Sequence, residues 1–440
     1  MLVMKFGGTS VGKPERMKKI ADLVLSVSGK KIVVLSALSG TTNSLVAIGD
    51  HLLLGQKAKA EEVIVGLENH YQAFIKELYS SEGFQAIGQE IVSRFFIFIR
   101  LLAAGQFDNK SYRELLAQGE LISTELFYQH LQERKISARL LPALYFMSID
   151  ENEEPELEKI SDRLKPLVSS LTNVEIIITQ GYICRNHRNE IDNLKRGGSD
   201  YTASLVGAAI RAEEIQIWTD IDGMHNNDPR VVKKTVPISE LTFDEASELA
   251  YFGAKILHPS TIVPAQKYNV PVRLKNTMDE KAFGTIITSK GTEGSFKAIA
   301  AKDGITAINI KSSRMLMAYG FLRRVFEVFE NHKTSIDMIT TAEVSVSLTI
   351  DNDTHLSSIE AELKKFGTIE VDKDQTIICI VGNKITEQKG MLNKVFDALA
   401  EIPVRMVCCG GSPNNVTVLV DKSYKEKALN VLNEELFGLK

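Results

Sequence analysis

An internal repeat in the last third of the chain constrains the fold more than any other feature. Apolar residues and glycines recur at a spacing of 70 residues, with a two-residue gap between a helix and a strand. Gly320 opens the predicted helix of the first copy, and Gly390 opens that of the second. Each copy reads strand–helix–strand–strand. A duplication of this kind usually means two small units packed side by side, so residues 299–440 are predicted to form two α+β units.

The two copies differ at polar positions. The first copy has Asp337 and Glu343 where the second has Arg405 and Gly411. Duplicated scaffolding is one interpretation of the repeat. Two carboxylates that occur in only one copy suggest instead a cation-binding site there, so we favour a ligand-sensing role for the repeat.

The preceding 295 residues alternate between strand and helix patterns. Apolar, β-branched runs that predict buried strands lie at residues 2–6, 31–36, 138–141, 174–179, 214–219 and 270–274. Helical spacing of apolar residues starts at Pro14 and recurs at residues 44–104, 111–134, 203–211 and 242–252. This alternation predicts an α/β domain with a mostly parallel sheet that ends near residue 295. Ligands of such sheets bind at the carboxyl ends of the strands.

The first strand ends in a glycine turn that leads to a helix start. Lys5 precedes Gly7 and Gly8, and Pro14 suits the first helical position. This geometry favours phosphate binding. Residues 7–13 also fit the opening of a P-loop, but Pro14 stands where that motif needs a hydroxyl group for Mg²⁺. On this segment alone, a packing junction and a phosphate site are equally open interpretations.

Composition excludes several classes of protein. The chain has 440 residues, of which 44% are hydrophobic and 25% charged, with a formal net charge of −4, typical of a soluble multidomain protein. No basic block indicates nucleic acid as a partner. The most apolar run, residues 95–99, is too short to span a membrane, and no signal peptide is visible. The four cysteines lack zinc-ligand spacing, which favours a reducing cytoplasm.

Charged side chains follow the predicted strands. Lys5 and Lys255 suit phosphate oxygens, Arg196 can clamp a carboxylate, and Glu120 can hold an ammonium group. Asp200 and Asp220 can hold Mg²⁺, and the Asp228-Pro229-Arg230 turn can aim Arg230. Each alone could be an ordinary surface charge or a helix cap. Together they indicate a site for an amino acid and a nucleoside triphosphate.

No histidine or cysteine nucleophile is needed for such a reaction. A carboxylate substrate is already ionised at neutral pH, so its attack on a γ-phosphoryl group requires no general base. Catalysis would consist of alignment and charge neutralisation.

Seven short motifs occur in order along the chain, at residues 5–10, 36–43, 118–120, 196–200, 218–220, 228–230 and 253–259. With these motifs the chain resembles aspartate kinase over essentially its whole length, and its repeat resembles the paired ACT domains of that family. The resemblance implies an amino acid kinase domain over residues 1–295, a first ACT domain over 313–383, and a second over 299–312 plus 384–440.

The resemblance implies transfer of the ATP γ-phosphate to the β-carboxylate of L-aspartate with Mg²⁺, the first step toward lysine and diaminopimelate, threonine and methionine. The implied catalytic residues are Lys5, Asp200 and Lys255. Those implied for aspartate are Thr42, Glu120, Tyr182, Arg196 and Ser199, with Arg196 on the α-carboxylate and Glu120 on the ammonium. Those implied for the nucleotide and its phosphates are Gly7, Gly8, Ser36, Thr219, Asp220, His225, Arg230 and Lys255.

The first copy of the repeat resembles the lysine-inhibited type of the family. The implied effector residues are Met315, Gly320, Phe321, Leu322, Ser335, Asp337, Thr341 and Glu343. Feedback inhibition and a homodimer or larger assembly through the ACT domains are expected. Met317 and Ala318 replace polar residues common in that type, so lysine would bind weakly or give way to another effector. Tyr182 and His225 also depart from the family pattern, since a Phe and an aromatic residue, respectively, are common there.

Two alternatives remain open. A kinase of the same fold could act on glutamate or an N-acetylated amino acid, although an ammonium-binding Glu120 argues against acetylated substrates. The chain could also be an amino-acid sensor on an inactive kinase domain, although Lys5, Asp200 and the other charged residues of the motifs are all present.

Overall fold

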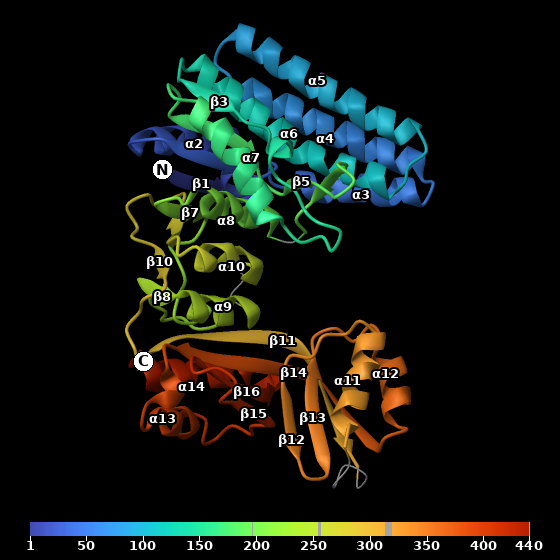
Figure 1. Ribbon diagram of the computed structural model, residues 1–440, viewed down its shortest axis with the longest axis vertical. Coiled ribbons are helices and arrows are strands. Elements are labelled where there is room, and N and C mark those ends of the chain that lie inside the picture. Colours follow the sequence, from blue (N-terminus) through green and yellow to red (C-terminus); the bar gives the residue numbers. More distant parts are fainter. Residues whose placement is uncertain (196, 254–256, 313–318, 440) are drawn as a thin grey trace. The chain divides into compact units, whose positions relative to one another are not determined.

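The computed structural model describes residues 1–195, 197–253, 257–312 and 319–439. The chain forms two compact units, residues 1–224 with 257–289, and residues 225–256 with 290–440 (Figure 1). Residues 225–256 therefore group with the C-terminal part of the chain. The domain boundaries implied by the resemblance stay predictions.

A mostly parallel sheet forms the centre of the first unit. Its strands there run in the order β3-β4-β2-β1-β7-β9-β10, and the last pair is antiparallel. Their bounds are β1 (Leu2–Phe6), β2 (Lys31–Leu35), β3 (Ala138–Leu140), β4 (Ile176–Gln180), β7 (Glu214–Thr219), β9 (Val272–Asn276) and β10 (Thr285–Thr288). This order confirms the predicted α/β fold class.

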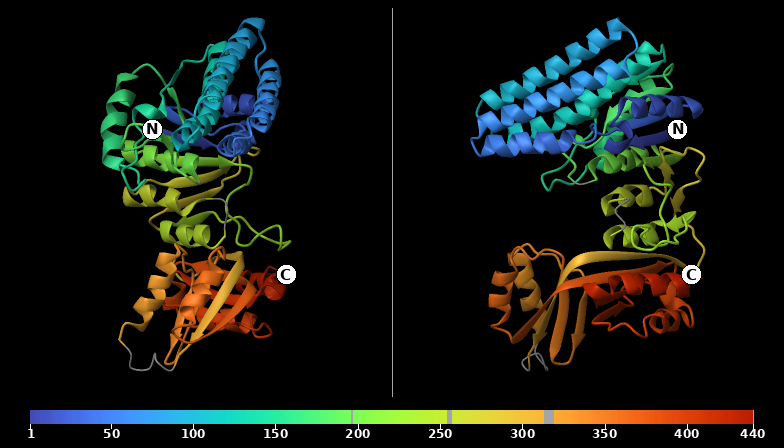
Figure 2. Two further views of the ribbon diagram at one scale, coloured as in Figure 1. Left: turned by 90° about the vertical axis from the view of Figure 1, so that its right-hand side faces the viewer. Right: turned by 180° about the vertical axis from the view of Figure 1, so that it is seen from behind.

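Helices cover the sheet, and the long helices α3 to α6 lie side by side (Figures 1 and 2). Alternate strand residues such as Met4 and Phe6 pack into one core with these helices. Lys5 lies between them in the strand, so it points to the opposite face, where α8 packs on β1. The helices of this unit are α1 (Gly8–Val11), α2 (Pro14–Ser26), α3 (Thr41–Leu53), α4 (Lys57–Leu78), α5 (Glu82–Ala104), α6 (Asn109–Glu133), α7 (Leu157–Ser170), α8 (Gly198–Ile210) and α10 (Pro259–Lys267).

Three boundaries differ from the sequence prediction. The segment predicted as a loop over residues 37–43 enters helix α3 at Thr41. Helix α8 begins at Gly198 rather than at residue 203, because Gly197 adopts a left-handed conformation (φ 70°) that starts the helix early. The polar segment after Tyr182 contains a hairpin of β5 (Ile183–Arg185) and β6 (Ile191–Asn193) instead of a plain loop.

The second unit contains a six-stranded antiparallel sheet, in the order β12-β13-β11-β14-β16-β15. Its strands are β11 (Phe296–Lys311), β12 (Ile339–Ala342), β13 (Ser345–Ile350), β14 (Thr368–Gly382), β15 (Met406–Cys409) and β16 (Asn415–Asp421). The unit's helices are α11 (Phe321–Asn331), α12 (Leu356–Leu363), α13 (Met391–Ala398) and α14 (Lys425–Phe437). A short strand β8 (Glu240–Thr242) and helix α9 (Phe243–Tyr251), which a Thr242–Glu245 capping box starts, also belong to it.

The two copies of the repeat share the long strands β11 and β14. Residues 306–311 of β11 pair with β13 of the first copy, whereas residues 298–302 pair with the part of β14 that joins β16. Each copy has its own core, around Ile308 and Val325 in one and Ile378 and Val395 in the other. The duplicated α+β units that the repeat predicts are therefore present. No helix among the described residues is long and apolar enough to cross a membrane.

Candidate active site

An ion pair joins the first strand to the start of α8. Nζ of Lys5, at the end of β1, lies 2.6 Å from Oδ1 of Asp200 in the first turn of α8. Lys5 is 9% exposed, and the side chain of Asp200 is 16% exposed. Both residues were predicted from sequence as catalytic, and the structure places them together at the carboxyl end of a parallel strand, where such sheets bind ligands.

The glycines after β1 leave room for this lysine. A Cβ atom on Gly7 would lie 3.1 Å from Nζ of Lys5, and one on Gly8 would lie 3.1 Å from the carbonyl oxygen of Ala37. The β1–α1 turn therefore packs closely against the segment that follows β2. Ser36 begins that segment, and its carbonyl oxygen accepts a hydrogen bond from Ser123 of α6 (2.8 Å).

Glu120 is a buried carboxylate with an open acceptor. The backbone N–H of Ala37 donates to its Oε1 (3.2 Å), while its Oε2 has no hydrogen-bond partner among the described residues. Burial raises the pKa of Glu120 to about 8, only partly opposed by hydrogen bonds from the backbone. A buried acceptor with no cation beside it suits the ammonium group of a small ligand. Thr42, the second residue of α3, follows the same segment.

Tyr182 packs on the start of α8 in a conformation that bulky residues rarely adopt (φ 67°). Thr202 holds it there, since its Oγ1 accepts from the N–H of Tyr182 (3.0 Å) and donates to the carbonyl of Gly198 (2.8 Å). A Cβ atom on Gly198 would lie 2.5 Å from the ring of Tyr182. Ser199 is packed as closely against Gly181. The structure therefore brings Tyr182 and Ser199 next to Asp200.

The residues predicted to bind the nucleotide are divided between the units. Thr219 ends β7 in the first unit, and its hydroxyl donates to Oδ1 of Asp220 (3.2 Å). In the second unit, Nδ1 of His225 lies 2.8 Å from Oγ1 of Thr235. Arg230 forms a two-point ion pair with Asp228 (2.9 and 2.8 Å), which holds the pKa of Asp228 below its usual value. The predicted turn thus engages Arg230 with its own neighbour.

Most predicted effector residues lie in the first copy of the repeat. Gly320 takes a left-handed conformation (φ 77°) before α11, Phe321 is buried in the core, and Leu322 is 37% exposed. Ser335 is exposed before β12, and Thr341 lies within that strand.

The structure does not bring the two carboxylates of the first copy together. The N–H of Asp337 donates to the carbonyl of Thr349, at one end of the β12–β13 hairpin. Glu343 lies in the tight turn between Ala342 and Ser345, at the other end. The cation site expected from both residues therefore reduces to Asp337.

Arg196, Lys255 and Met315 lie outside the described residues, as do Met317 and Ala318. Within the described ranges, no three histidine, cysteine or acidic side chains group as metal ligands. An Mg²⁺ ion that keeps waters and bridges phosphates needs only one or two protein carboxylates, which Asp200 and Asp220 can supply.

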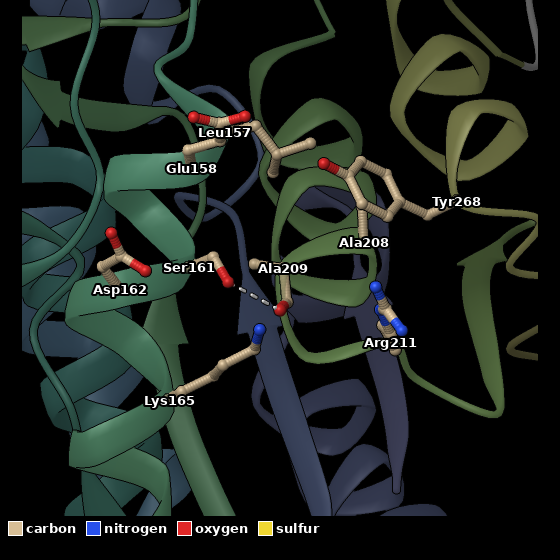
Figure 3. A pocket seen from close by; sticks show the side chains of 9 residues that line it. All are labelled: Leu157, Glu158, Ser161, Asp162, Lys165, Ala208, Ala209, Arg211 and Tyr268. Atoms are coloured by element: carbon tan, nitrogen blue, oxygen red, sulfur yellow. Dashed lines mark hydrogen bonds between the residues drawn. The ribbon is translucent and has the colours of Figure 1, made fainter.

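The first unit also contains a cavity of about 260 Å³ between α7, α8 and α10 (Figure 3). The Ser161 hydroxyl there donates to the carbonyl of Ala209 (3.1 Å), and Lys165 and Arg211 lie toward one end. No predicted site residue lines this cavity, so it is separate from the candidate active site.

Sequence reasoning missed three residues around Asp337. Nζ of Lys302 lies 2.9 Å from Asp337 and 2.8 Å from Asp351, and the hydroxyl of Tyr251 donates to Asp337 (3.0 Å). The one available signal was the repeat itself, because Lys302 and Asp372 lie 70 residues apart and carry opposite charges.

Comparisons with known proteins agree with this arrangement. A model of the amino acid kinase family matches residues 1–276, and an ACT domain model matches residues 378–436. The lysine-sensitive aspartokinase 3 of Escherichia coli (strain K12) is 35% identical over 453 residues, which cover 99% of each chain.

Two crystal structures of E. coli aspartokinase III are similar to this chain. The complex with aspartate and ADP (R-state) is 34% identical, with a TM-score of 0.84 over 99% of this chain and 100% of that one. The complex with lysine and aspartate (T-state) is 35% identical, with a TM-score of 0.83 over 99% of both. On its full-length similarity and its fold, the chain belongs to the aspartokinase family and is a phosphotransferase.

Proposed function

We propose that this protein transfers the γ-phosphate of ATP to the β-carboxylate of L-aspartate, giving 4-phospho-L-aspartate. The observation that carries the proposal is the buried Glu120, whose unpartnered oxygen in the first unit suits an α-ammonium group. The similar E. coli enzyme has been crystallised with aspartate and ADP, which supports this choice of substrates.

Substrate binding follows from charge. The ammonium of aspartate would pair with Glu120, and its α-carboxylate with Arg196, with Thr42, Tyr182 and Ser199 around it. Those two contacts leave the β-carboxylate as the group that meets the phosphate. N-acetylated amino acids lack the cation that Glu120 needs. Glutamate keeps both α-groups and remains the alternative substrate.

Phosphoryl transfer then requires neutralised charge and alignment rather than a base. Lys5, held by Asp200, would contact the transferred phosphoryl group, and Lys255 the nucleotide phosphates. Gly7, Gly8 and Ser36 would border the phosphates, and Thr219, Asp220, His225 and Arg230 the rest of the nucleotide. Asp200 and Asp220 would hold Mg²⁺, which neutralises phosphate charge when bound.

We further propose that the reaction opens the route to lysine and diaminopimelate, threonine and methionine, and that lysine inhibits it through the ACT domains. The crystallised complex of the E. coli enzyme with lysine and aspartate supports this effector. Met317 and Ala318 predict weak binding or another amino-acid effector. A homodimer or larger assembly through the ACT domains, in a reducing cytoplasm that suits four free cysteines, completes the proposal.

Trapping of the acyl phosphate tests the reaction. Hydroxylamine converts 4-phosphoaspartate to a coloured hydroxamate, so full-length protein is incubated with ATP, Mg²⁺ and either L-aspartate or L-glutamate. We expect hydroxamate from L-aspartate, its loss in Lys5→Met, and its retention in Lys13→Met, which removes a nearby exposed lysine. Product from L-glutamate alone would establish the alternative substrate. No product from either would favour the inactive sensor.

A further inference from the structure

A lysine of the chain itself occupies an ammonium-binding site in the second unit. Nζ of Lys302 lies 2.9 Å from Oδ1 of Asp337 and 2.8 Å from Oδ2 of Asp351. The same ammonium lies over the ring of Tyr251, 5.0 Å from its centroid. Two carboxylates and an aromatic face are the groups that recognise a primary ammonium ion.

Asp337 has capacity for another donor. Its side chain is only 1% exposed, and its Oδ1 receives both Lys302 and the hydroxyl of Tyr251 (3.0 Å). Its Oδ2 has no hydrogen-bond partner among the residues that the structure describes. A buried carboxylate oxygen without a donor is costly, and an entering ammonium group would remove that cost.

The second copy of the repeat shows which part of this cluster is special. Asp372 and Arg405 stand at the positions that correspond to Lys302 and Asp337, with the charges exchanged. They too form an ion pair (2.8 Å), but their side chains are 43% and 39% exposed. The duplicated scaffold thus keeps an ion pair at this place, and only the first copy buries the acidic partner and joins it to α9 through Tyr251.

We propose that Asp337, Asp351 and the ring of Tyr251 form a receptor for a primary ammonium group, and that Lys302 is its built-in competitor. An amino acid with a side-chain ammonium would bind at the open oxygen of Asp337 and exchange with Lys302. This inference deepens the proposed function, on which it rests only for the choice of L-lysine as probe.

The contacts make such an exchange feasible. Lys302 keeps Asp351 as a partner when it leaves Asp337, so no charge is left alone. Burial works against the charge on Lys302, but hydrogen bonds to Asp351 and Asp337 outweigh it and raise the pKa of the ammonium. Lys302 therefore remains a charged competitor at neutral pH, and its affinity for Asp337 limits that of the ligand.

Tyr251 gives the exchange a route to the kinase residues. It is the last residue of α9, which packs on β11 and β14, and it precedes Lys255 by four positions in the sequence. An ammonium ligand on Asp337 competes for the acceptor of the Tyr251 hydroxyl. Loss of that hydrogen bond would loosen the end of α9.

Calorimetric binding of L-lysine to the full-length protein tests the competitor. Lys302→Gln removes the internal ammonium. Lys425→Gln is the matched control, since Lys425 pairs with Asp303 and is 22% exposed, against 21% for Lys302. We expect Lys302→Gln to bind L-lysine about fivefold or more tightly, and Lys425→Gln to stay within about twofold of the wild type. Thermal unfolding without ligand verifies that each variant is folded.

The outcomes separate this inference from the proposed reaction. Unchanged, weaker or absent L-lysine binding in folded Lys302→Gln would overturn the competitor role, whatever the hydroxamate assay gives. Tighter binding in Lys302→Gln without hydroxamate formation by the wild type would keep the receptor and remove the proposed reaction.

Tyr251→Phe tests the link to α9, because it keeps the ring and removes only the hydroxyl. Inhibition is expressed relative to the variant's own rate without L-lysine. We expect L-lysine to bind at least as tightly as to the wild type, while the maximal inhibition falls to less than half. Wild-type inhibition in Tyr251→Phe would show that the hydroxyl carries no signal.

Discussion

Two buried carboxylates, one in each unit, differ in what already holds them. Glu120 accepts one backbone hydrogen bond, has one open oxygen and has no ion-pair partner among the described residues. Asp337 also has an open oxygen, but its other oxygen holds Lys302 and Tyr251. Burial therefore raises the pKa of Glu120 to about 8, whereas Asp337 has its positive charge supplied by the chain.

The difference teaches how one protein can treat two ammonium ligands differently. An empty carboxylate must lose a proton before it can pair with a substrate ammonium, so its affinity depends on pH. A carboxylate already paired with a lysine must exchange that lysine, so its affinity depends on an internal competitor. The first arrangement suits a substrate and the second suits a regulatory ligand.

The largest effect should come from the lysine of the first unit. Lys5→Met removes the cation next to Asp200 that we assign to the transferred phosphoryl group. We expect kcat to fall by about a thousandfold. Lys302→Met should change the response to L-lysine far more than kcat, and steady-state kinetics of both variants compares the two. Equal losses of kcat would erase the distinction between these lysines.

Replacing each carboxylate by its amide should separate substrate from effector. Glu120→Gln leaves no anion for the ammonium of aspartate, and we expect KM for aspartate to rise by about 100-fold. Asp337→Asn should raise the L-lysine concentration for half-maximal inhibition by about tenfold or more. Initial-rate measurements over both ligands test the pair. A larger KM effect from Asp337→Asn than from Glu120→Gln would reverse the assignment.

The empty carboxylate should also affect stability as a function of pH. Between its ordinary pKa of 4.5 and its raised value of about 8, the folded state keeps a proton on Glu120 that the unfolded state has lost. The free energy of unfolding of the ligand-free protein therefore falls as pH rises through this window.

Glu120→Gln cannot lose that proton, so it should gain stability relative to the wild type by about 2 kcal/mol or more between pH 5 and pH 8.5. Urea unfolding at both pH values measures the difference. A constant gap between the two proteins would mean that Glu120 is ionised in the folded state throughout.

The smallest effect should come from the exposed pair of the second copy. Arg405→Ala breaks the contact with Asp372, but water replaces it, so we expect a stability change within about 1 kcal/mol. The response to L-lysine should stay unchanged, as calorimetry can show. A changed response would mean that the second copy also contributes to the ammonium site.

Local patterns were enough to predict the fold class and much of the candidate site. Alternating apolar strands and helices predicted the parallel sheet, and the 70-residue repeat predicted the paired α+β units. The motif at residues 5–10 placed Lys5 at the end of a strand, and the structure brings it to Asp200.

Contacts between distant segments could not be read from those patterns. Gly197, in a left-handed conformation, starts α8 early and so puts Ser199 and Asp200 in its first turn. The cluster around Asp337 depends on the pairing of β11 with β13 and on the packing of α9. The sequence showed Asp337 as a candidate cation ligand, but only the structure reveals that Lys302 is the cation.

Proton release on aspartate binding tests the central claim about Glu120 most directly. L-Aspartate is titrated calorimetrically at pH 7 into the full-length protein saturated with Mg²⁺ and ADP, in two buffers with different ionisation enthalpies. With a pKa of about 8 for Glu120, the account predicts release of nearly one proton per aspartate bound. An enthalpy that is the same in both buffers would show that Glu120 is already ionised or does not receive the ammonium group, and would contradict the account.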